Sequence, residues 1–157
     1  MTNDFVIERI SDANFDDFIS LIRKLAEYER LPGPDEEAKV RLKRDGLSEN
    51  PKYEAYLAIL NGTAIGYIIY FMTYSTFLAL PTLFIEDLFL LEEYRRKGYG
   101  QQMFNFCVKE AKRRKSGRVE WAVLTWNEPA IKFYEKNEAS RLGWYFYRLT
   151  REDFVRY

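Results

Sequence analysis

The chain has 157 residues, a length that suits one domain, and 47% of them are hydrophobic, enough for a sizeable core. Lysine plus arginine equals aspartate plus glutamate, 24 each, so no global basic field favours nucleic acid. The absence of histidine excludes serine–histidine and cysteine–histidine catalysis and most zinc sites. We therefore expect no metal and no nucleic-acid partner, and acid–base chemistry must use carboxylates, tyrosine, lysine, cysteine or ordered water.

The single cysteine and the start of the chain bear on its compartment. Cys107 lies in an apolar helical pattern, which indicates a buried structural thiol rather than a nucleophile. No intrachain disulfide is possible, which fits a reducing cytosol. Asp4, Glu8 and Arg9 interrupt any apolar run that would open a secretory signal, and no apolar run reaches the length of a membrane span. These features predict a cytoplasmic protein with no membrane partner.

The first third of the chain reads as one strand and two helices. A strand is expected over residues 5–10, and Ser11 or Asp12 can cap the helix that follows. The sequence Leu-Pro-Gly-Pro at 31–34 ends that helix, and a second helix runs over 35–46.

The rest of the chain alternates strands and helices. The predicted strands are 53–60, 64–73, 82–91, 119–125 and 144–149, and an Asn-Gly turn joins the first two as a hairpin. One helix follows Gly98 to about residue 115, and another is opened by Pro129. The order β-α-α-β-β-β-α-β-α-β indicates a mixed α/β (α+β mixed-sheet) fold in a single domain over residues 1–157.

Residues 85–101 join an apolar strand, a basic glycine-containing turn and the start of a helix. Such a turn lines up backbone N–H groups beside the positive end of a helix dipole, which makes an anion site for phosphate or pyrophosphate. It is neither the mononucleotide loop nor the dinucleotide fingerprint, because only Gly98 and Gly100 are present. The alternative is a turn whose glycines only permit positive φ and close packing.

Glu86 and Asp87 interrupt an otherwise apolar run over 83–91. A charge in such a strand costs several kcal/mol unless it is paired or faces a wet cleft. Neighbours in a regular strand point to opposite faces, so both carboxylates serve one site only if the strand is bulged or splayed there. The alternative is that one or both pair with arginine or lysine at a sheet edge.

A second segment, residues 126–134, opens a helix with Asn127, which can cap it. Tyr134 falls at helical spacing from Ala130 and Ile131, so the local pattern alone indicates a core aromatic.

Together these segments resemble a known family. The turn Arg-Arg-Lys-Gly-Tyr-Gly at 95–100 is similar to the pyrophosphate signature of the GNAT N-acetyltransferases, Gln/Arg-x-x-Gly-x-Gly/Ala, and 127–134 is similar to their second cofactor motif. Stretches shared with the diamine (spermidine/spermine) acetyltransferase branch are collinear over almost the whole chain: 25–29, 70–74, 85–87, 126–129 and 143–144. The chain is therefore expected to have the GNAT fold.

The resemblance implies acetyl-CoA as co-substrate. The backbone of Leu88, Phe89 and Leu90 would pair with the pantetheine arm, and Asn127 would lie beside the cofactor. Backbone N–H groups of the turn would hold the pyrophosphate, with added positive charge from its cations. The residues assigned to this cofactor site are Arg95, Arg96, Lys97, Gly98, Tyr99, Gly100 and Gln101.

The resemblance also implies the chemical roles. Tyr134, beside the cofactor, would protonate the departing CoA thiolate, which suits a phenol of pKa about 10. Glu86, through water, would help to remove the proton of the incoming ammonium, and Asp87 would attract the cationic substrate. Tyr28, Glu29 and Trp144 lie in the shared stretches and are assigned to substrate binding.

Ser75 departs from the polyamine-acetylating members, which carry Asp-Pro-Trp after the matching tyrosine and use its aspartate to bind the distal amine. The Tyr-Ser-Thr sequence at 74–76 is closer to the related thialysine acetyltransferases. We therefore assign Ser75 to the substrate site and favour a thialysine- or lysine-like amine over a long polyamine. The alternative is neutral drift in a loop.

The predicted function is direct acetyl transfer from acetyl-CoA to a small primary amine, a diamine or polyamine or a thialysine- or lysine-like compound. The resemblance implies a homodimer. Two alternatives stay open: a protein or peptide N-acetyltransferase of the same fold, and a module that binds acetyl-CoA without turnover.

Overall fold

The computed structural model describes residues 4–157. The chain divides into two compact units, a first that ends at Ala122 and a second, Val123–Tyr157. The assignment of one domain to residues 1–157 stays a prediction. No helix in the described part of the chain is both long enough and apolar enough to cross a membrane.

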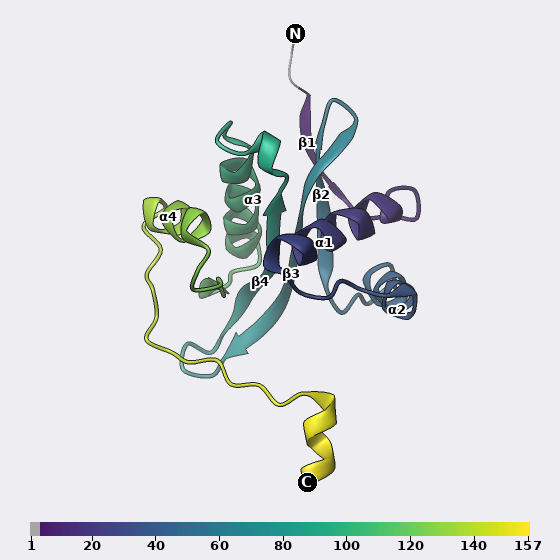
Figure 1. Ribbon diagram of the computed structural model, residues 1–157. Coiled ribbons are helices and arrows are strands. Elements are labelled where there is room, and N and C mark those ends of the chain that lie inside the picture. Colours follow the sequence, from purple (N-terminus) through teal and green to yellow (C-terminus); the bar gives the residue numbers. More distant parts are fainter. Residues whose placement is uncertain (1–3) are drawn as a thin grey trace. The chain divides into compact units, whose positions relative to one another are not determined.

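The first unit is built on a five-stranded mixed sheet, drawn in Figure 1. Its strands, in spatial as well as chain order, are β1 (Phe5–Arg9), β2 (Glu54–Leu60), β3 (Thr63–Ser75), β4 (Leu80–Leu90) and β5 (Arg118–Trp121). Consecutive strands pair antiparallel except β4 and β5, which are parallel. Asn61 and Gly62 have φ of 50° and 80°, as a two-residue hairpin turn requires, so that predicted turn is confirmed.

Three α-helices belong to the first unit and one to the second. They are α1 (Phe15–Glu29), α2 (Glu36–Gly46) and α3 (Tyr99–Arg113), then α4 (Glu128–Lys136); the short 3₁₀ helices are η1 (Glu92–Tyr94) and η2 (Arg151–Arg156). The Asp35 side chain caps α2 by accepting the Ala38 N–H at 2.8 Å. The predicted cap of α1 is wrong: Asn14 holds that position, and its side chain turns back to accept the Ser11 N–H at 2.7 Å.

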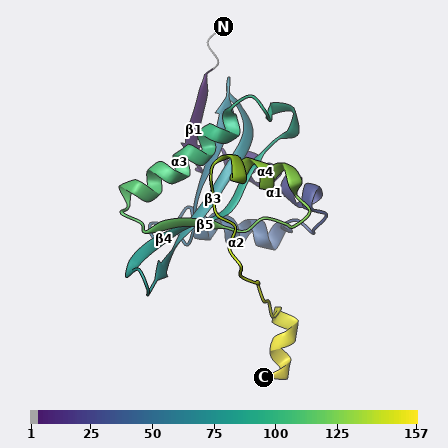
Figure 2. The same ribbon diagram turned by 90° about the vertical axis from the view of Figure 1, so that its left-hand side faces the viewer.

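Helices cover both faces of the sheet. Because neighbouring residues of a strand point to opposite faces, Tyr67 lies on the α1 face, where it meets Phe18 edge-on with ring centroids 5.6 Å apart. α2 packs against the same core through Leu42. On the other face, which Figure 2 turns toward the viewer, α3 places Phe106 against Tyr56 at 4.8 Å.

Cys107 lies in the buried face of α3. Its side chain has no exposed surface, and burial raises the pKa of its thiol to about 12. The thiolate is therefore scarce at neutral pH, which confirms the interpretation as a structural thiol.

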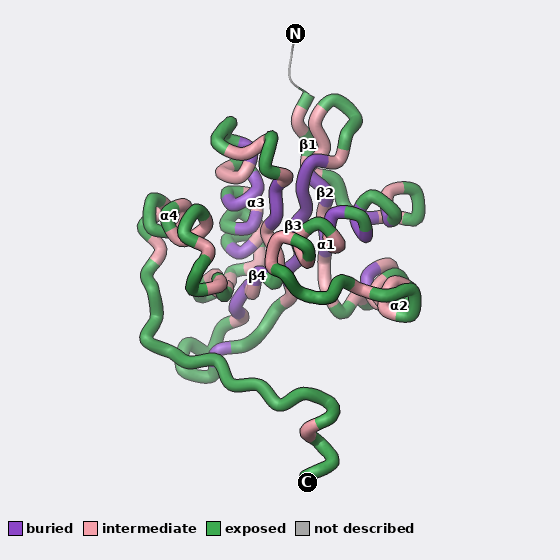
Figure 3. The backbone as a smooth tube through the Cα atoms, in the orientation of Figure 1, coloured by how far each residue is buried: buried purple, intermediate pink, exposed green. Residues whose placement is uncertain are grey.

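Two strand predictions for the C-terminal third need correction. β5 ends at Trp121, four residues before the predicted end at residue 125. Residues 144–149 were expected to close the sheet, but they have no regular secondary structure and every one is exposed, as the green tube in Figure 3 shows. A strand depends on a neighbour for its hydrogen bonds, and local β-propensity does not supply one.

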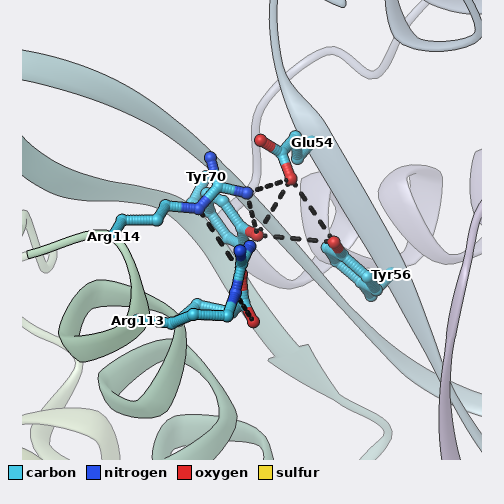
Figure 4. A network of polar contacts seen from close by, with 6 residues as sticks. Glu54, Tyr56, Tyr70, Arg113 and Arg114 are labelled. Atoms are coloured by element: carbon cyan, nitrogen blue, oxygen red, sulfur yellow. Dashed lines mark hydrogen bonds and ion pairs between the residues drawn. The ribbon is translucent and has the colours of Figure 1, made fainter.

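A polar network ties the C-terminal end of α3 to the sheet (Figure 4). The Arg114 guanidinium donates to Glu54 at 2.7 Å and to the Tyr70 hydroxyl at 3.3 Å, and Tyr70 donates to Glu54 at 3.0 Å. Burial alone would raise the pKa of Glu54, but the Arg114 guanidinium outweighs it and the pKa is lowered. This anchor fixes the direction of α3 and hence the place where its N-terminal turn meets β4.

Replacing Arg114 by alanine should destabilise the fold by about 2 kcal/mol, because the half-buried Glu54 carboxylate loses its cation. The matched control is the neighbouring Arg113→Ala. The Arg113 side chain is 65% exposed against 23% for Arg114, and it pairs with Glu110 at the surface, so its loss should destabilise the fold clearly less. Urea unfolding of both variants measures the difference, and equal losses would contradict an anchoring function for Arg114.

Candidate active site

The β4 strand contains a bulge at the acidic pair. In its pairing with β3, Ile69 lies opposite Asp87 and Tyr70 lies opposite Ile85, so Glu86 has no partner in the register. The extra residue changes which face the following side chains occupy. The bulge that the sequence required for both carboxylates to serve one site is confirmed.

Beyond the bulge, Asp87 lies on the α1 face of the sheet. The Tyr67 hydroxyl donates to its Oδ2 at 3.1 Å. Tyr67 has no exposed surface, and burial, reinforced by the charge of Asp87, raises the pKa of its phenol, so the hydroxyl stays protonated and remains a donor. Sequence reasoning did not identify Tyr67, because its proximity to Asp87 follows from the hairpin register and no local pattern marks it.

Three carboxylates share this region: Glu29 at the end of α1, exposed Glu86 and half-buried Asp87. Burial raises the pKa of Asp87 to about 6, and the charge of Glu86 adds to the rise. The Tyr67 hydrogen bond opposes the rise, and the charge of Glu29 adds to it. Burial also raises the pKa of Glu29. The structure therefore brings together three of the residues that the sequence assigned to catalysis and substrate binding.

These acids lack a lysine or arginine partner in the described part of the chain. Among residues 4–157, no ion pair joins Glu29, Glu86 or Asp87 to a lysine or arginine. In the same described range, no group of three or more carboxylate or thiol side chains is placed to hold a metal ion. A half-buried acidic cluster that no lysine or arginine of the described residues neutralises is suited to a cationic ligand from solution.

Arg95, the cation nearest in sequence to Glu86 and Asp87, makes other contacts. Its Nε donates to the Leu90 carbonyl at 2.9 Å, and its guanidinium lies over the ring of Tyr28 at 5.0 Å and that of Phe89 at 5.9 Å. Arg95 thus links the end of α1 to the end of β4. Tyr28 is thereby placed beside the β4–α3 turn, next in the chain to Glu29 of the acidic cluster.

The β4–α3 turn has the backbone shape expected of an anion site. Arg96 and Gly98 have φ of 59° and 87°, both in the left-handed region, and Gly98 is the residue from which α3 starts. The first N–H groups of a helix point out of its N-terminus, where the helix dipole is positive. Arg96 and Lys97 are exposed beside them.

Within the first turn of α3, Gly100 has no steric reason to be glycine. Outside the backbone of its own helix and its two chain neighbours, the atom nearest to a Cβ at this position would be a Leu90 methyl carbon at 3.9 Å, which is an ordinary contact. Glycine inside a helix costs about 1 kcal/mol relative to alanine. The space that a Cβ would fill is consistent with a ligand that approaches the backbone. Of its neighbours, Tyr99 is buried and stacked on Phe5, and Gln101 donates to Asn105.

β4 extends beyond its parallel neighbour. The last pair between the two strands is Ile85 with Trp121, whereas β4 continues to Leu90. The predicted pantetheine-binding residues Leu88, Phe89 and Leu90 lie in this overhang, at the carboxyl end of the strand, where open α/β sheets bind ligands.

Ser75 lies away from the acidic cluster. It is 6% exposed at the end of β3, where its hydroxyl accepts the Leu78 N–H at 3.2 Å and closes the hairpin turn. It pairs with Leu80, six residues before Glu86, which at about 3.3 Å per residue is roughly 20 Å along the strand. Within one chain, Ser75 and Glu86 are therefore too far apart to contact the same small amine.

The remaining predicted residues belong to the second unit. Asn127 holds the N-cap position of α4, but its side chain makes no capping hydrogen bond. Tyr134 is half-buried on α4, with its ring 5.4 Å from that of Phe133. Trp144 lies in the exposed segment that follows α4 and is 78% exposed.

Comparisons with known proteins bear on this site. Residues 16–138 match the acetyltransferase (GNAT) family. L-ornithine N5-acetyltransferase NATA1 of Arabidopsis thaliana is 41% identical over 105 residues, 65% of this chain and 46% of that protein, so the match spans less than half of its length. Thialysine N-epsilon-acetyltransferase of Bos taurus is 29% identical over 159 residues, which cover 94% of this chain and 93% of that protein.

A solved structure shares the fold. The aminoglycoside N-acetyltransferase AAC(6')-Iy in complex with CoA superposes with a TM-score of 0.77, covering 96% of this chain and 97% of that one, at 14% identity. The predicted GNAT fold is thereby confirmed. The resemblance to the branch that contains the thialysine enzymes is confirmed by the relatives' names.

The raised pKa of Asp87 predicts how stability depends on pH. The folded chain binds this proton more tightly than the unfolded chain, whose pKa is 3.8, so stability falls as pH rises from about 4 through about 6. Asp87→Asn removes the titration and should gain roughly 1–3 kcal/mol over the wild type between pH ~4 and pH ~8. Denaturant unfolding at both pH values measures this change. The exposed control Glu93→Gln should show none, and a pH-independent difference for Asp87→Asn would contradict the buried charge.

Proposed function

The chain belongs to the acetyltransferase (GNAT) family, and from this premise we propose that it transfers the acetyl group of acetyl-CoA directly to a small primary amine. The observation that carries the proposal is the acidic cluster of Glu29, Glu86 and Asp87, with which no lysine or arginine among residues 4–157 forms an ion pair. A protonated amine supplies the missing positive charge.

The acceptor is inferred to be thialysine-, lysine- or ornithine-like. The names of the two relatives support a short amine that carries a second polar group. Asp87 and Glu29 attract the ammonium, and Tyr28 borders the turn on the side of α1. Ser75 and Trp144 are proposed as further substrate contacts. Ser75 does not adjoin the acidic cluster, and a long polyamine would need more than this cluster to hold its far end.

The proposed transfer needs two proton movements. An ammonium cannot attack a thioester, so Glu86, through water, takes one proton and leaves a neutral amine. The nitrogen then forms a bond to the acetyl carbon, and as the carbon–sulfur bond breaks the phenol of Tyr134 protonates the leaving thiolate. The nitrogen loses its second proton on becoming an amide, and this proton in net restores the Tyr134 phenol. Cys107 is buried and its pKa is raised, which supports direct transfer rather than an acetylated cysteine.

Acetyl-CoA fits the residues of the turn. The overhang of β4 at Leu88 to Leu90 offers an edge for an amide-containing arm, and the start of α3 offers N–H groups and space at Gly100 for a pyrophosphate. Arg96 and Lys97 add positive charge, whereas Arg95 acts by holding the end of β4. Asn127 and Tyr134 are proposed as cofactor contacts on the resemblance alone. We also propose a cytoplasmic homodimer on that basis.

Gly100→Ala tests the cofactor site without disturbing the fold. A methyl group here makes only an ordinary contact with Leu90, so the free energy of unfolding should stay the same or rise by about 1 kcal/mol. The dissociation constant for acetyl-CoA should rise about tenfold or more, which corresponds to about 1.4 kcal/mol. Calorimetric titration gives this value, and Lys109→Ala on the exposed side of α3 is the control. Unchanged affinity would remove the turn from the cofactor site.

Release of CoA thiol with a panel of amines tests the reaction. The panel contains thialysine, L-lysine, L-ornithine, putrescine, spermidine and a short peptide, and thialysine or ornithine is expected to give the highest kcat/KM. Highest turnover with spermidine would contradict the preference for a short amine. Preference for the peptide would indicate the protein-acetylating alternative, and acetyl-CoA binding with no turnover would favour a binding module.

Tyr134→Phe, measured with the same amines, tests the proposed proton donor. It removes only the phenolic hydroxyl, so kcat should fall roughly 10²- to 10⁴-fold while the acetyl-CoA dissociation constant stays the same. Normal turnover would exclude Tyr134 as the proton donor.

A further inference from the structure

Packing alone does not explain the hydroxyl group of Tyr67. The side chain lies in β3 with no exposed surface. Apolar groups surround its ring: Phe18 of α1 meets it edge-on at 5.6 Å, Phe89 of β4 lies at 5.9 Å, and Leu57 is its partner in β2. Phenylalanine would make the same ring contacts. Because a hydroxyl removed from water costs free energy unless it is hydrogen-bonded, its presence here has to be explained by its partner.

That partner is Asp87, whose Oδ2 accepts the Tyr67 hydroxyl at 3.1 Å. The two residues are diagonal neighbours across the β3–β4 ladder, because Tyr67 pairs with Phe89 and Asp87 pairs with Ile69. Diagonal neighbours lie roughly 7–8 Å apart, which a long aromatic side chain can span. The packed ring fixes the position of the hydroxyl, and the hydroxyl in turn fixes the carboxylate.

A tyrosine hydroxyl orients a carboxylate without cancelling its charge. Burial raises the pKa of the Tyr67 phenol, so the hydroxyl remains a neutral donor. Glu54, in contrast, is neutralised by the guanidinium of Arg114 at 2.7 Å. One donated hydrogen bond leaves Asp87 with an oxygen, Oδ1, that can accept from a ligand. The pair thus offers an oriented negative charge on the α1 face of the sheet.

We propose that Tyr67 is a positioning residue of the acceptor site, which holds Asp87 by one oxygen and leaves the other for the ammonium group of the substrate. This inference rests on the proposed function and adds to it the residue that orients the substrate's counter-charge. The charged or titratable groups that act on Asp87 are Glu29 from α1, Tyr67 from β3 and Glu86 from β4. Of the three, only Tyr67 donates a hydrogen bond to it.

The pair has a consequence for the pH dependence of amine binding. Burial raises the pKa of Asp87 to about 6, and the Tyr67 hydrogen bond opposes that rise because it stabilises the ionised carboxylate. An ammonium binds the ionised form, so affinity should increase as pH rises through about 6 in the wild type. Without the hydroxyl, the pKa of Asp87 rises further, and the increase in affinity moves to higher pH.

Calorimetric titration of the full chain with L-ornithine, in the presence of CoA and from about pH 5 to about pH 8, tests the pair. The side-chain ammonium of ornithine stays protonated over this range. Tyr67→Phe should raise the ornithine dissociation constant about tenfold near pH ~7 and move the midpoint of its pH dependence up by about one unit. The dissociation constant for CoA should stay the same.

Tyr53→Phe is the matched control. It removes a hydroxyl that donates to the Leu42 carbonyl at 2.6 Å, from a ring stacked on the same Phe18 at 6.4 Å. It should lower the free energy of unfolding while leaving the ornithine dissociation constant and its pH midpoint unchanged. An equal change in Tyr53→Phe, or no change in Tyr67→Phe, would overturn the positioning role.

The double variant Tyr67→Phe/Asp87→Asn separates positioning from packing. If Tyr67 acts through Asp87, removing the hydroxyl from the Asp87→Asn variant should cause no further loss of ornithine affinity, and a further tenfold loss would contradict the proposal. Turnover is recorded separately from binding. A wild type that binds ornithine without acetylating it contradicts the proposed transfer alone, whereas a wild type that does not bind ornithine overturns both proposals.

Discussion

The bulge at Glu86 is the constraint on which the candidate site depends. With a regular β4, Asp87 would occupy the same face as Ile85, which lies opposite Tyr70 and toward α3. One extra residue moves Asp87 to the α1 face, where Tyr67 donates to it and the charge of Glu29 reaches it. The pairing of β4 with β5 also ends at the residue before the bulge. A single local irregularity thus gathers the acids and coincides with the start of the strand overhang.

Keeping these carboxylates together and partly buried costs free energy, which the rest of the fold offsets. Burial and mutual repulsion raise the pKa of Asp87, and the Tyr67 hydrogen bond offsets only part of that rise. Another half-buried carboxylate in the same sheet does have partners. Glu54 accepts hydrogen bonds from Arg114 and from the Tyr70 hydroxyl, and its pKa is lowered. The contrast within one sheet shows that paired acids anchor helices here, whereas the unpaired acids are available to a cationic ligand.

The sequence predicted the parts of the site that local chemistry determines. Two acids in an apolar strand could serve one site only through a bulge, and a bulge is present; the glycines of the β4–α3 turn permit the left-handed φ found at Gly98. It did not predict Tyr67, because only the hairpin register brings that residue to Asp87. Ser75 was assigned because it stands where the polyamine-acetylating members have an aspartate. Its hydroxyl accepts the Leu78 N–H in the hairpin turn, a contact that depends on the turn's conformation and that no local pattern indicates.

The failed prediction at residues 144–149 has a different physical origin. Their aromatic composition correctly favours a strand, but a strand is defined by the neighbour that accepts its hydrogen bonds. Propensity therefore predicts that the segment will pair, and it carries no information on whether the edge belongs to the same chain or to another.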